Sequence, residues 1–380
     1  MLHFSDQEFA DRLDRTRAAM AARGLDVLLV FAPESQFWLT GYDTFGYCFF
    51  QCLVVSQDRD PVLLTRSADL RQAQLTSIIR DIRVWVDGID ADPARDLAAL
   101  LEAIGLSGRR TGWETRTHGL THGKGMAVAG VVDGLVDASD LIGTLRLIKS
   151  PAEIAYTRVA ADLSDAAFDA AAATAAPGVG EGAILAAMHK ATFDGNGDYP
   201  ANEFIIGSGE HALLCRYQSG RRTLDQTDQL TLEWAGTFRH YHAANMKTLA
   251  IGRARPEHGA MQDAAHAALA ACEEALRPGE PMSAVFDAHA RTLDAAGMSA
   301  HRLNACGYAL GARFSPSWME DQMFYDGAPT IMAPGMVFFL HMILMDSDTG
   351  AAMTLGRTSL VTETGSEPLG RMPLDLVVCP

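Results

Sequence analysis

The chain contains no long apolar run and no leader-like beginning. Among its 380 residues there is no stretch of about eighteen consecutive apolar residues, the length a helix needs to cross a bilayer. Residues 1–6 (MLHFSD) have neither the basic start nor the apolar centre of a secretion signal. We therefore expect a cytoplasmic protein that does not insert into a membrane.

Paired cysteines and positive charge are also scarce. The six cysteines are scattered, and Cys48 and Cys52 have no second pair of similar spacing, so buried free thiols are expected rather than a zinc site. The 47 Asp and Glu residues outnumber the 31 Lys and Arg residues, which gives a net charge of −16. Because phosphate-rich partners require positive surface, this balance argues against nucleic acid and anionic membranes. It suits a protein that acts on small molecules.

The first part of the chain alternates strand and helix patterns but lacks a dinucleotide fingerprint. A capping box at Ser5 predicts a helix to residue 22, and apolar runs predict strands at 27–31, 47–55 and 61–65, with further short strands near Val84 and Arg110. No G-x-G-x-x-G follows any of these strands, so a dinucleotide role is not supported. We predict an α/β domain over residues 1–147.

The second part of the chain repeats one order of elements. The boundary lies at 145–154, where Ser150 is placed to cap a helix that begins at Pro151. An Ala-rich helix ends at 177–178, a shorter helix covers 181–193, and strands occupy 203–206 and 230–251. The order recurs with helices that end at 277–279 and at 296, and with strands at 336–344 and 358–362. This indicates an internal duplication within a second domain, 148–380, whose halves close a pocket between their sheets.

The segment 229–252 carries an unusual density of ionisable and aromatic side chains. Leu230 and Leu232 alternate with Glu233, so that the carboxylate is expected on the opposite strand face from the leucines. We expect a turn at Gly236, followed by a second strand that carries His242. Taken alone, a glutamate on such a strand is equally well a solvated surface charge.

Several motifs together resemble the superfamily of methionine aminopeptidase, prolidase and creatinase. They are the junction 149–154, the two Pro-Gly breaks, the loop 307–311, and the segments 334–338 and 360–365. The resemblance covers nearly the whole chain. It implies an α/β N-terminal domain followed by an α+β, duplicated "pita-bread" catalytic domain, in which the strands bearing Glu233 and His341 are counterparts.

The resemblance also implies that the metal ligands of the family have been lost. Its metallopeptidases hold two ions with two aspartates, a histidine and two glutamates, and these five positions fall at Glu233, Ala244, Tyr308, His341 and Gly356. One carboxylate and one imidazole cannot fill the coordination shell of a hard divalent cation. We predict a site with no metal and no other cofactor.

Two metal-free branches of the superfamily, creatinase and ectoine hydrolase, are relevant to the activity. The segments 198–201, 233–236, 307–311 and 315–318 are most similar to ectoine hydrolase, in which a glutamate at the position of Glu233 is thought to be the nucleophile. The chain departs from that family at Cys215 and Arg216, where a Pro-His pair is usual, and at Gly356, where a glutamate is retained. A related small zwitterion is therefore an open alternative substrate.

A site that binds a small zwitterionic amidine needs an anion to meet the amidinium group, a cation to meet the carboxylate, and flat apolar side chains as walls. Glu233 would pair with the amidinium group or attack its carbon, and His242 or His341 would move the proton. The remaining candidates bind substrate: Arg216 or Arg313 holds its carboxylate, His211 is a weaker candidate, and the walls come from Tyr241, Tyr308, Trp318, Trp38 and Tyr42. Because Trp38 and Tyr42 belong to the N-terminal domain, the resemblance implies a homodimer in which that domain covers the partner's pocket.

The first prediction is thus a metal-independent hydrolase of a C–N bond, with ectoine or hydroxyectoine as substrate. A creatinase-like amidinohydrolase is the second. The third is a non-catalytic binding protein on a peptidase fold that has lost its metals.

Overall fold

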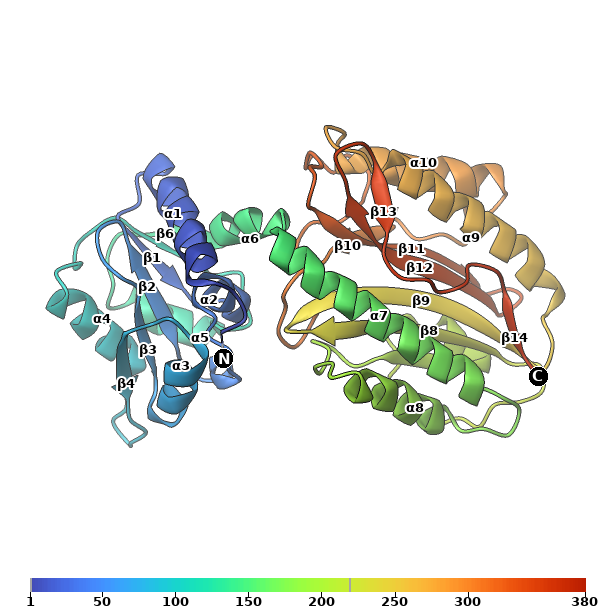
Figure 1. Ribbon diagram of the computed structural model, residues 1–380, viewed down its shortest axis with the longest axis horizontal. Helices are drawn as coiled ribbons and strands as arrows, with labels where there is room; N and C mark the ends of the chain where they lie inside the picture. Colours follow the sequence, from blue (N-terminus) through green and yellow to red (C-terminus); the bar gives the residue numbers. More distant parts are fainter. Residues whose placement is uncertain (1, 219) are drawn as a thin grey trace. The chain divides into compact units, whose positions relative to one another are not determined.

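The computed structural model describes residues 2–218 and 220–380 and divides the chain into two units, Met1–Arg146 and Leu147–Pro380. Each unit has its own sheet (Figure 1). The fold class predicted from the sequence is confirmed, with an α/β first unit and a duplicated α+β second unit.

The first unit is built on a six-stranded sheet in the order β4-β3-β2-β1-β5-β6. Its strands are β1 Val27–Val30, β2 Cys52–Ser56, β3 Val62–Arg66, β4 Asp81–Trp85, β5 Thr111–Trp113 and β6 Leu135–Asp137. Its helices are α1 Asp6–Ala22, α2 Pro33–Thr40, α3 Leu70–Thr76, α4 Pro93–Ala103, α5 His122–Ala129 and α6 Ser139–Leu147. The strand expected at 47–55 is shorter than predicted, because residues 46–48 form a 3-10 turn before β2 begins.

Trp38 and Tyr42 lie in the core of the first unit, each with 1% of its surface exposed. Trp38 packs in a cluster with Leu28, Val30 and Leu53, and the Tyr42 hydroxyl is 3.2 Å from the Thr65 hydroxyl. The prediction that these two rings wall a partner's pocket is therefore wrong, since side chains in a domain core cannot contact a neighbouring subunit.

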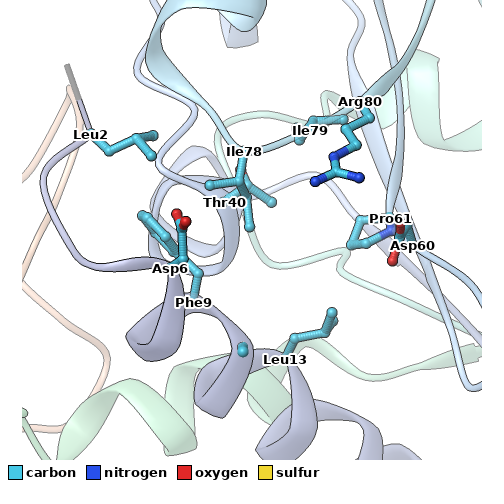
Figure 2. A pocket seen from close by; sticks show the side chains of 11 residues that line it. Leu2, Asp6, Phe9, Leu13, Thr40, Asp60, Pro61, Ile78, Ile79 and Arg80 are labelled. Carbon is cyan, nitrogen blue, oxygen red and sulfur yellow. The ribbon is translucent and has the colours of Figure 1, made fainter.

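A cleft of about 590 Å³ opens in the first unit between α1 and the segment 78–80. Figure 2 shows the charged groups of Asp6 and Arg80 on opposite sides of this cleft, with Phe9 and Leu13 as part of its apolar lining.

In residues 2–218 and 220–380, no helix is long and apolar enough to cross a membrane.

The second unit is built on an eight-stranded sheet whose central order, β10-β11-β12-β9-β8-β7, reads as two mirrored halves. The first half comprises α7 Pro151–Thr174, α8 Glu181–Asp194, β7 Ile205–Ser208, β8 Gln229–Phe238 and β9 Tyr241–Ile251. The second comprises α9 Pro256–Ala275, α10 Met282–Ala295, β10 Gly307–Ala309, β11 Val337–Asp346 and β12 Ala351–Val361. Two short strands, β13 Ser366–Pro368 and β14 Val377–Cys379, pair with β12 and β9. Figure 1 shows α7 and α8 with the yellow strands and α9 and α10 with the red ones, as the duplication predicts.

The start of α7 has the local chemistry that the sequence indicates. The Ser150 hydroxyl accepts the Glu153 N–H at 3.2 Å, the Glu153 carboxylate accepts the Ser150 N–H at 2.9 Å, and Pro151 occupies the first turn. This capping box satisfies two backbone donors at the helix N-terminus, so α7 begins at a fixed residue.

Gly236 is not the turn between β8 and β9, contrary to the sequence expectation. It lies within β8, and a Cβ atom there would be 2.0 Å from the carbonyl oxygen of Ala160 in α7. The turn is formed by Arg239 and His240, whose φ angles of 51° and 66° are those of a type I′ hairpin turn. Gly236 is therefore required by helix packing rather than by a turn.

Candidate active site

The strand register places Glu233 on the face of the sheet that points away from α7. Its neighbour Trp234 points toward α7, where its indole N–H donates to the Ser164 carbonyl at 2.9 Å and its ring stacks on Phe168. Because side chains alternate across a strand, the carboxylate of Glu233 is on the opposite face, as predicted.

A single row of paired residues crosses the sheet from Glu233 to His341. Glu233 pairs with Met246, Met246 with Gly356, and Gly356 with His341. Since directly paired residues share a face, Glu233 and His341 lie on the same surface at equivalent places in the two halves. Ala244 pairs with Ala235 on that same surface. The duplication thus brings the predicted site positions together.

The Glu233 carboxylate is buried and accepts one hydrogen bond from the described residues. The residue has 5% of its surface exposed, and its Oε1 accepts a hydrogen bond from the Tyr308 hydroxyl at 3.1 Å. Burial raises the pKa of Glu233 to about 7, while the charge of Arg216 and the Tyr308 hydrogen bond act to lower it. The carboxyl group therefore changes its protonation near neutral pH.

Tyr308 lies beside this carboxylate, and Trp318 lies beside Tyr308. The Trp318 indole N–H donates to the Tyr308 hydroxyl at 2.8 Å, and both side chains are buried. Burial and the neighbouring Glu233 charge raise the pKa of Tyr308 well above its usual value, so the phenol keeps its proton. The sequence predicts both rings as substrate walls, but in the fold the Trp318 N–H faces the Tyr308 hydroxyl, and that hydroxyl faces Glu233.

His341 also lies beside the Tyr308 ring. The two ring centroids are 5.8 Å apart. Burial lowers the pKa of His341 to about 3, so its ring is neutral at working pH. Its Nδ1 has no hydrogen-bond partner within the described residues, which leaves one polar atom free to meet a ligand or a water molecule.

His242 shares this face but is occupied by the backbone. Its Nε2 accepts the Ala201 N–H at 2.9 Å, and its Nδ1 lies 3.4 Å from the Gly311 carbonyl. An Nε2 that accepts requires the proton on Nδ1, so the ring is neutral. Burial lowers its pKa to about 3. Both ring nitrogens hold loops in place.

Tyr241 is on the other face of the sheet, so its assignment to the substrate site is wrong. Its hydroxyl donates to the Glu153 carboxylate at 2.7 Å, and its ring lies 5.9 Å from Tyr156 of α7. The residue is fully buried. It supports the start of α7.

The two candidate arginines differ in what they contact. Arg216 is exposed, and its charge lowers the pKa of both Glu233 and His341, which places it within electrostatic range of the site. Arg313 is half-buried and forms an ion pair with Glu320 at 3.3 Å. Arg216 is the better placed of the two to meet a substrate carboxylate.

His211 is engaged with its own loop. It lies in the 3-10 turn Gly209–Leu213 after β7, 4.6 Å from the Tyr217 ring and 3.9 Å from the Glu210 carboxylate. No contact with Glu233, Tyr308 or Trp318 is seen in the parts of the chain described.

Sequence reasoning missed two residues close to this centre. Asn202 accepts the Trp318 backbone N–H through its Oδ1 at 3.2 Å. Cys215 is half-buried, and burial together with the Glu233 charge raises the pKa of its thiol. In the sequence, an asparagine at position 202 and a cysteine at position 215 belong to no motif that would mark a functional site. Only the folded chain brings Asn202 beside Trp318.

The five positions at which the resemblance predicts the family's metal ligands lie on one surface, but their side chains do not fit a pair of ions. Ala244 has only a methyl group, and Tyr308 keeps its proton. At Gly356 a Cβ would be 2.6 Å from the Leu340 carbonyl oxygen and 2.9 Å from the Phe339 ring, so this backbone has no room for a side chain. Within the described residues no group of three or more His, Cys, Asp or Glu side chains is arranged to hold a metal.

Comparison with known proteins finds the same two-part organisation. Residues 155–363 match the model of metallopeptidase family M24, and residues 12–148 match that of the creatinase/prolidase N-terminal domain. An uncharacterized hydrolase/peptidase, y4tM, of Sinorhizobium fredii is 30% identical over 100% of this chain and 99% of its own length. The ectoine hydrolase of Halomonas elongata is 27% identical over 99% and 98%. A prolidase from Thermococcus sibiricus shares the fold, with a TM-score of 0.88 at 16% identity over 98% of this chain and 100% of that one.

Proposed function

The chain belongs to metallopeptidase family M24, with a creatinase/prolidase N-terminal domain, and within that family we propose a metal-independent hydrolase that opens a C–N bond of a small zwitterionic amidine. Ectoine or its hydroxylated form is the proposed substrate. The observation that carries the proposal is the Glu233 carboxyl group, buried on the face shared with His341 and with a pKa of about 7.

A buried carboxylate favours a ligand that is both cationic and flat. An amidinium group presents two N–H donors in one plane, which match the two oxygens of a carboxylate. Its positive charge would also lower the pKa of Glu233 and favour the ionised form. A neutral peptide bond offers neither the charge nor the paired donors.

The reaction adds one water molecule across the C–N bond and gives an amide and an amine. In one route, Glu233 takes a proton from water while the water oxygen bonds to the amidinium carbon. The C–N bond then breaks, its electron pair goes to nitrogen, and the proton passes from Glu233 to that nitrogen. The second proton of the water leaves the new hydroxyl as the carbonyl forms and passes to the departing amine, which is released as an ammonium ion. In the other route, a Glu233 oxygen bonds to the amidinium carbon, and the C–N bond breaks as the departing amine takes a proton from water. The hydroxide so formed adds to the same carbon and displaces the Glu233 carboxylate, and the remaining hydroxyl proton passes to the amine as the amide forms.

Glu233 can act as both base and acid because its pKa is near working pH. His341 and His242, with pKa values of about 3, cannot donate a proton as imidazolium near neutrality. We therefore propose that His341 binds the substrate or the water through its free Nδ1 and that His242 has a structural role. Arg216 is proposed to hold the substrate carboxylate.

Two further features support this substrate class. The ectoine hydrolase of Halomonas elongata matches nearly the whole chain, although at 27% identity. The donor set beside Glu233 does not suit the two ions expected in a metallopeptidase. The homodimer implied by the resemblance remains part of the proposal.

The test is incubation of the purified protein with ectoine, hydroxyectoine and creatine in separate reactions followed by proton NMR. Appearance of N-acetyl-diaminobutyrate or its hydroxylated counterpart is the expected result. Urea from creatine would favour the amidinohydrolase alternative. Tight binding of a zwitterion without turnover would favour a binding protein, and hydrolysis of an Xaa-Pro dipeptide would contradict the proposal.

A further inference from the structure

Three buried side chains form a continuous hydrogen-bonded chain that ends on Glu233. The Trp318 indole N–H donates to the Tyr308 hydroxyl at 2.8 Å, and the Tyr308 hydroxyl donates to Glu233 Oε1 at 3.1 Å. The exposed fractions are 1% for Trp318, 3% for Tyr308 and 5% for Glu233. Water therefore has little access to compete for these bonds.

The direction of this chain follows from the chemistry of its members. An indole N–H can only donate, and an ionised carboxylate can only accept. Because Trp318 occupies one acceptor position of the Tyr308 hydroxyl, the single phenolic proton is directed toward the carboxylate. Across the described residues Tyr308 is the one hydrogen-bond donor to Glu233, and its bond falls on Oε1. This leaves Oε2 without a protein donor.

We infer that Trp318 is a positioning residue for the proposed reaction: its indole N–H orients the Tyr308 hydroxyl, which holds Glu233 by Oε1 and leaves Oε2 as the reacting oxygen. The inference rests on the proposed role of Glu233. It also changes the role of the two rings, since the sequence assigned them only to flat substrate walls.

The position of Trp318 is itself fixed by neighbouring segments. Its backbone N–H donates to Asn202, and the adjacent Ala201 N–H donates to His242 of β9. The ion pair of Arg313 with Glu320 spans the same loop. These contacts tie the indole to the strand next to the one that carries Glu233, so its N–H is presented to Tyr308 in a fixed orientation.

A first experiment tests the hydrogen-bonded chain without requiring turnover. The indole proton and nitrogen resonances of the five tryptophans are recorded, and those of Trp318 and Trp234 are assigned with Trp318→Phe and Trp234→Phe. Trp234 is the matched control, because it is also buried and donates to a carbonyl on the other face of β8. In Tyr308→Phe the Trp318 resonance should move and the Trp234 resonance should not. An unmoved Trp318 resonance would overturn the inference even if the enzyme proves active.

A second experiment measures kcat and KM at pH 7 for the substrate found active. The loss of one neutral hydrogen bond predicts about a 3- to 10-fold lower kcat for Trp318→Phe with KM within about 2-fold. In the Tyr308→Phe background the same substitution should have no further effect, because Trp318 acts through that hydroxyl. Trp234→Phe should leave kcat unchanged.

The contrary kinetic results are equally specific. A raised KM with unchanged kcat would make Trp318 a substrate wall, and additive losses in the double variant would remove Tyr308 as the intermediary. If Trp318→Phe does not fold, 3-benzothienylalanine at position 318 replaces the N–H by sulfur and keeps the ring shape. Absence of turnover with every substrate would refute the proposed function, whereas the resonance test would still decide whether the chain exists.

Discussion

Replacing Tyr308 with phenylalanine should move the pH dependence of the reaction toward alkaline pH. The substitution removes one hydroxyl and keeps the ring, so the packing against Phe339 and His341 is retained. The Tyr308 hydrogen bond stabilises the ionised form of Glu233 and lowers its pKa. Without that bond, the pKa of Glu233 should rise above its present value of about 7.

The size of the shift follows from the energy of the bond. A hydrogen bond to a charged group contributes about 1.5–3 kcal/mol, which corresponds to a pKa rise of about 1–2 units. At pH 7 the ionised fraction of Glu233 would then fall from about one half to between about 1% and 10%, so kcat/KM should fall about 5- to 50-fold. At about pH 9–10 most of the activity should return, because Glu233 is then ionised in both proteins.

The assay is kcat/KM for ectoine from pH 5 to pH 10 in wild type and Tyr308→Phe. The wild-type rate should rise with pH through an apparent pKa near 7 and that of the variant through a higher one. The reasoning is refuted if the variant loses activity by the same factor at every pH, or if its acidic limb moves to lower pH.

Three further predictions concern residues around this centre. Glu233→Gln should abolish turnover yet stabilise the fold. A carboxyl group whose pKa rises from 4.5 to about 7 on folding contributes stability below pH 4.5 and loses it as the pH rises through 7. Thermal melting at pH 8 should therefore show that the variant gains up to about 3 kcal/mol, and unchanged stability would contradict the burial argument. Gly356→Ala should lower the free energy of unfolding by about 1–3 kcal/mol in urea titrations, since its Cβ would meet the Leu340 carbonyl, and a neutral result would show that the strands separate easily there. His242→Ala should lower the free energy of unfolding by about 2–4 kcal/mol, whereas a stable but inactive variant would restore His242 to a catalytic role.

Much of the second unit could be predicted from local signals. The Pro-Gly breaks and the capping box at Ser150 are properties of neighbouring residues, and they mark the helices correctly. The alternation of Leu232 and Glu233 likewise gives the correct strand face for the carboxylate. The mirrored order of the sheet follows from the repeat of elements along the chain.

The errors arose where the register depends on a contact distant in sequence. Gly236 has the composition of a turn but serves the close approach of α7, while the true turn contains neither Asn nor Gly. With Arg239 and His240 as the two turn residues, Phe238 pairs with Tyr241, and Tyr241 therefore faces α7 rather than the site. The face of Tyr241 follows from the turn position.

Burial likewise cannot be deduced from residue type. The sequence predicts Trp38 and Tyr42 as pocket walls because flat rings suit a planar cation and the resemblance places their domain over a partner's pocket, but the packing around β1 encloses both. The low pKa values of His242 and His341 also depend on their depth in the folded sheet, not on their place in the sequence.

The central claim is that hydrolysis at Glu233 needs no metal ion, and one measurement tests it most directly. Protein dialysed against a chelator is analysed for bound metal, and its kcat/KM for ectoine is then followed as manganese, iron or zinc is added back. We predict turnover by protein that carries less than about one metal ion per ten chains, with no increase on addition of any of the three ions. Activity that disappears on chelation and returns in proportion to bound metal would contradict it.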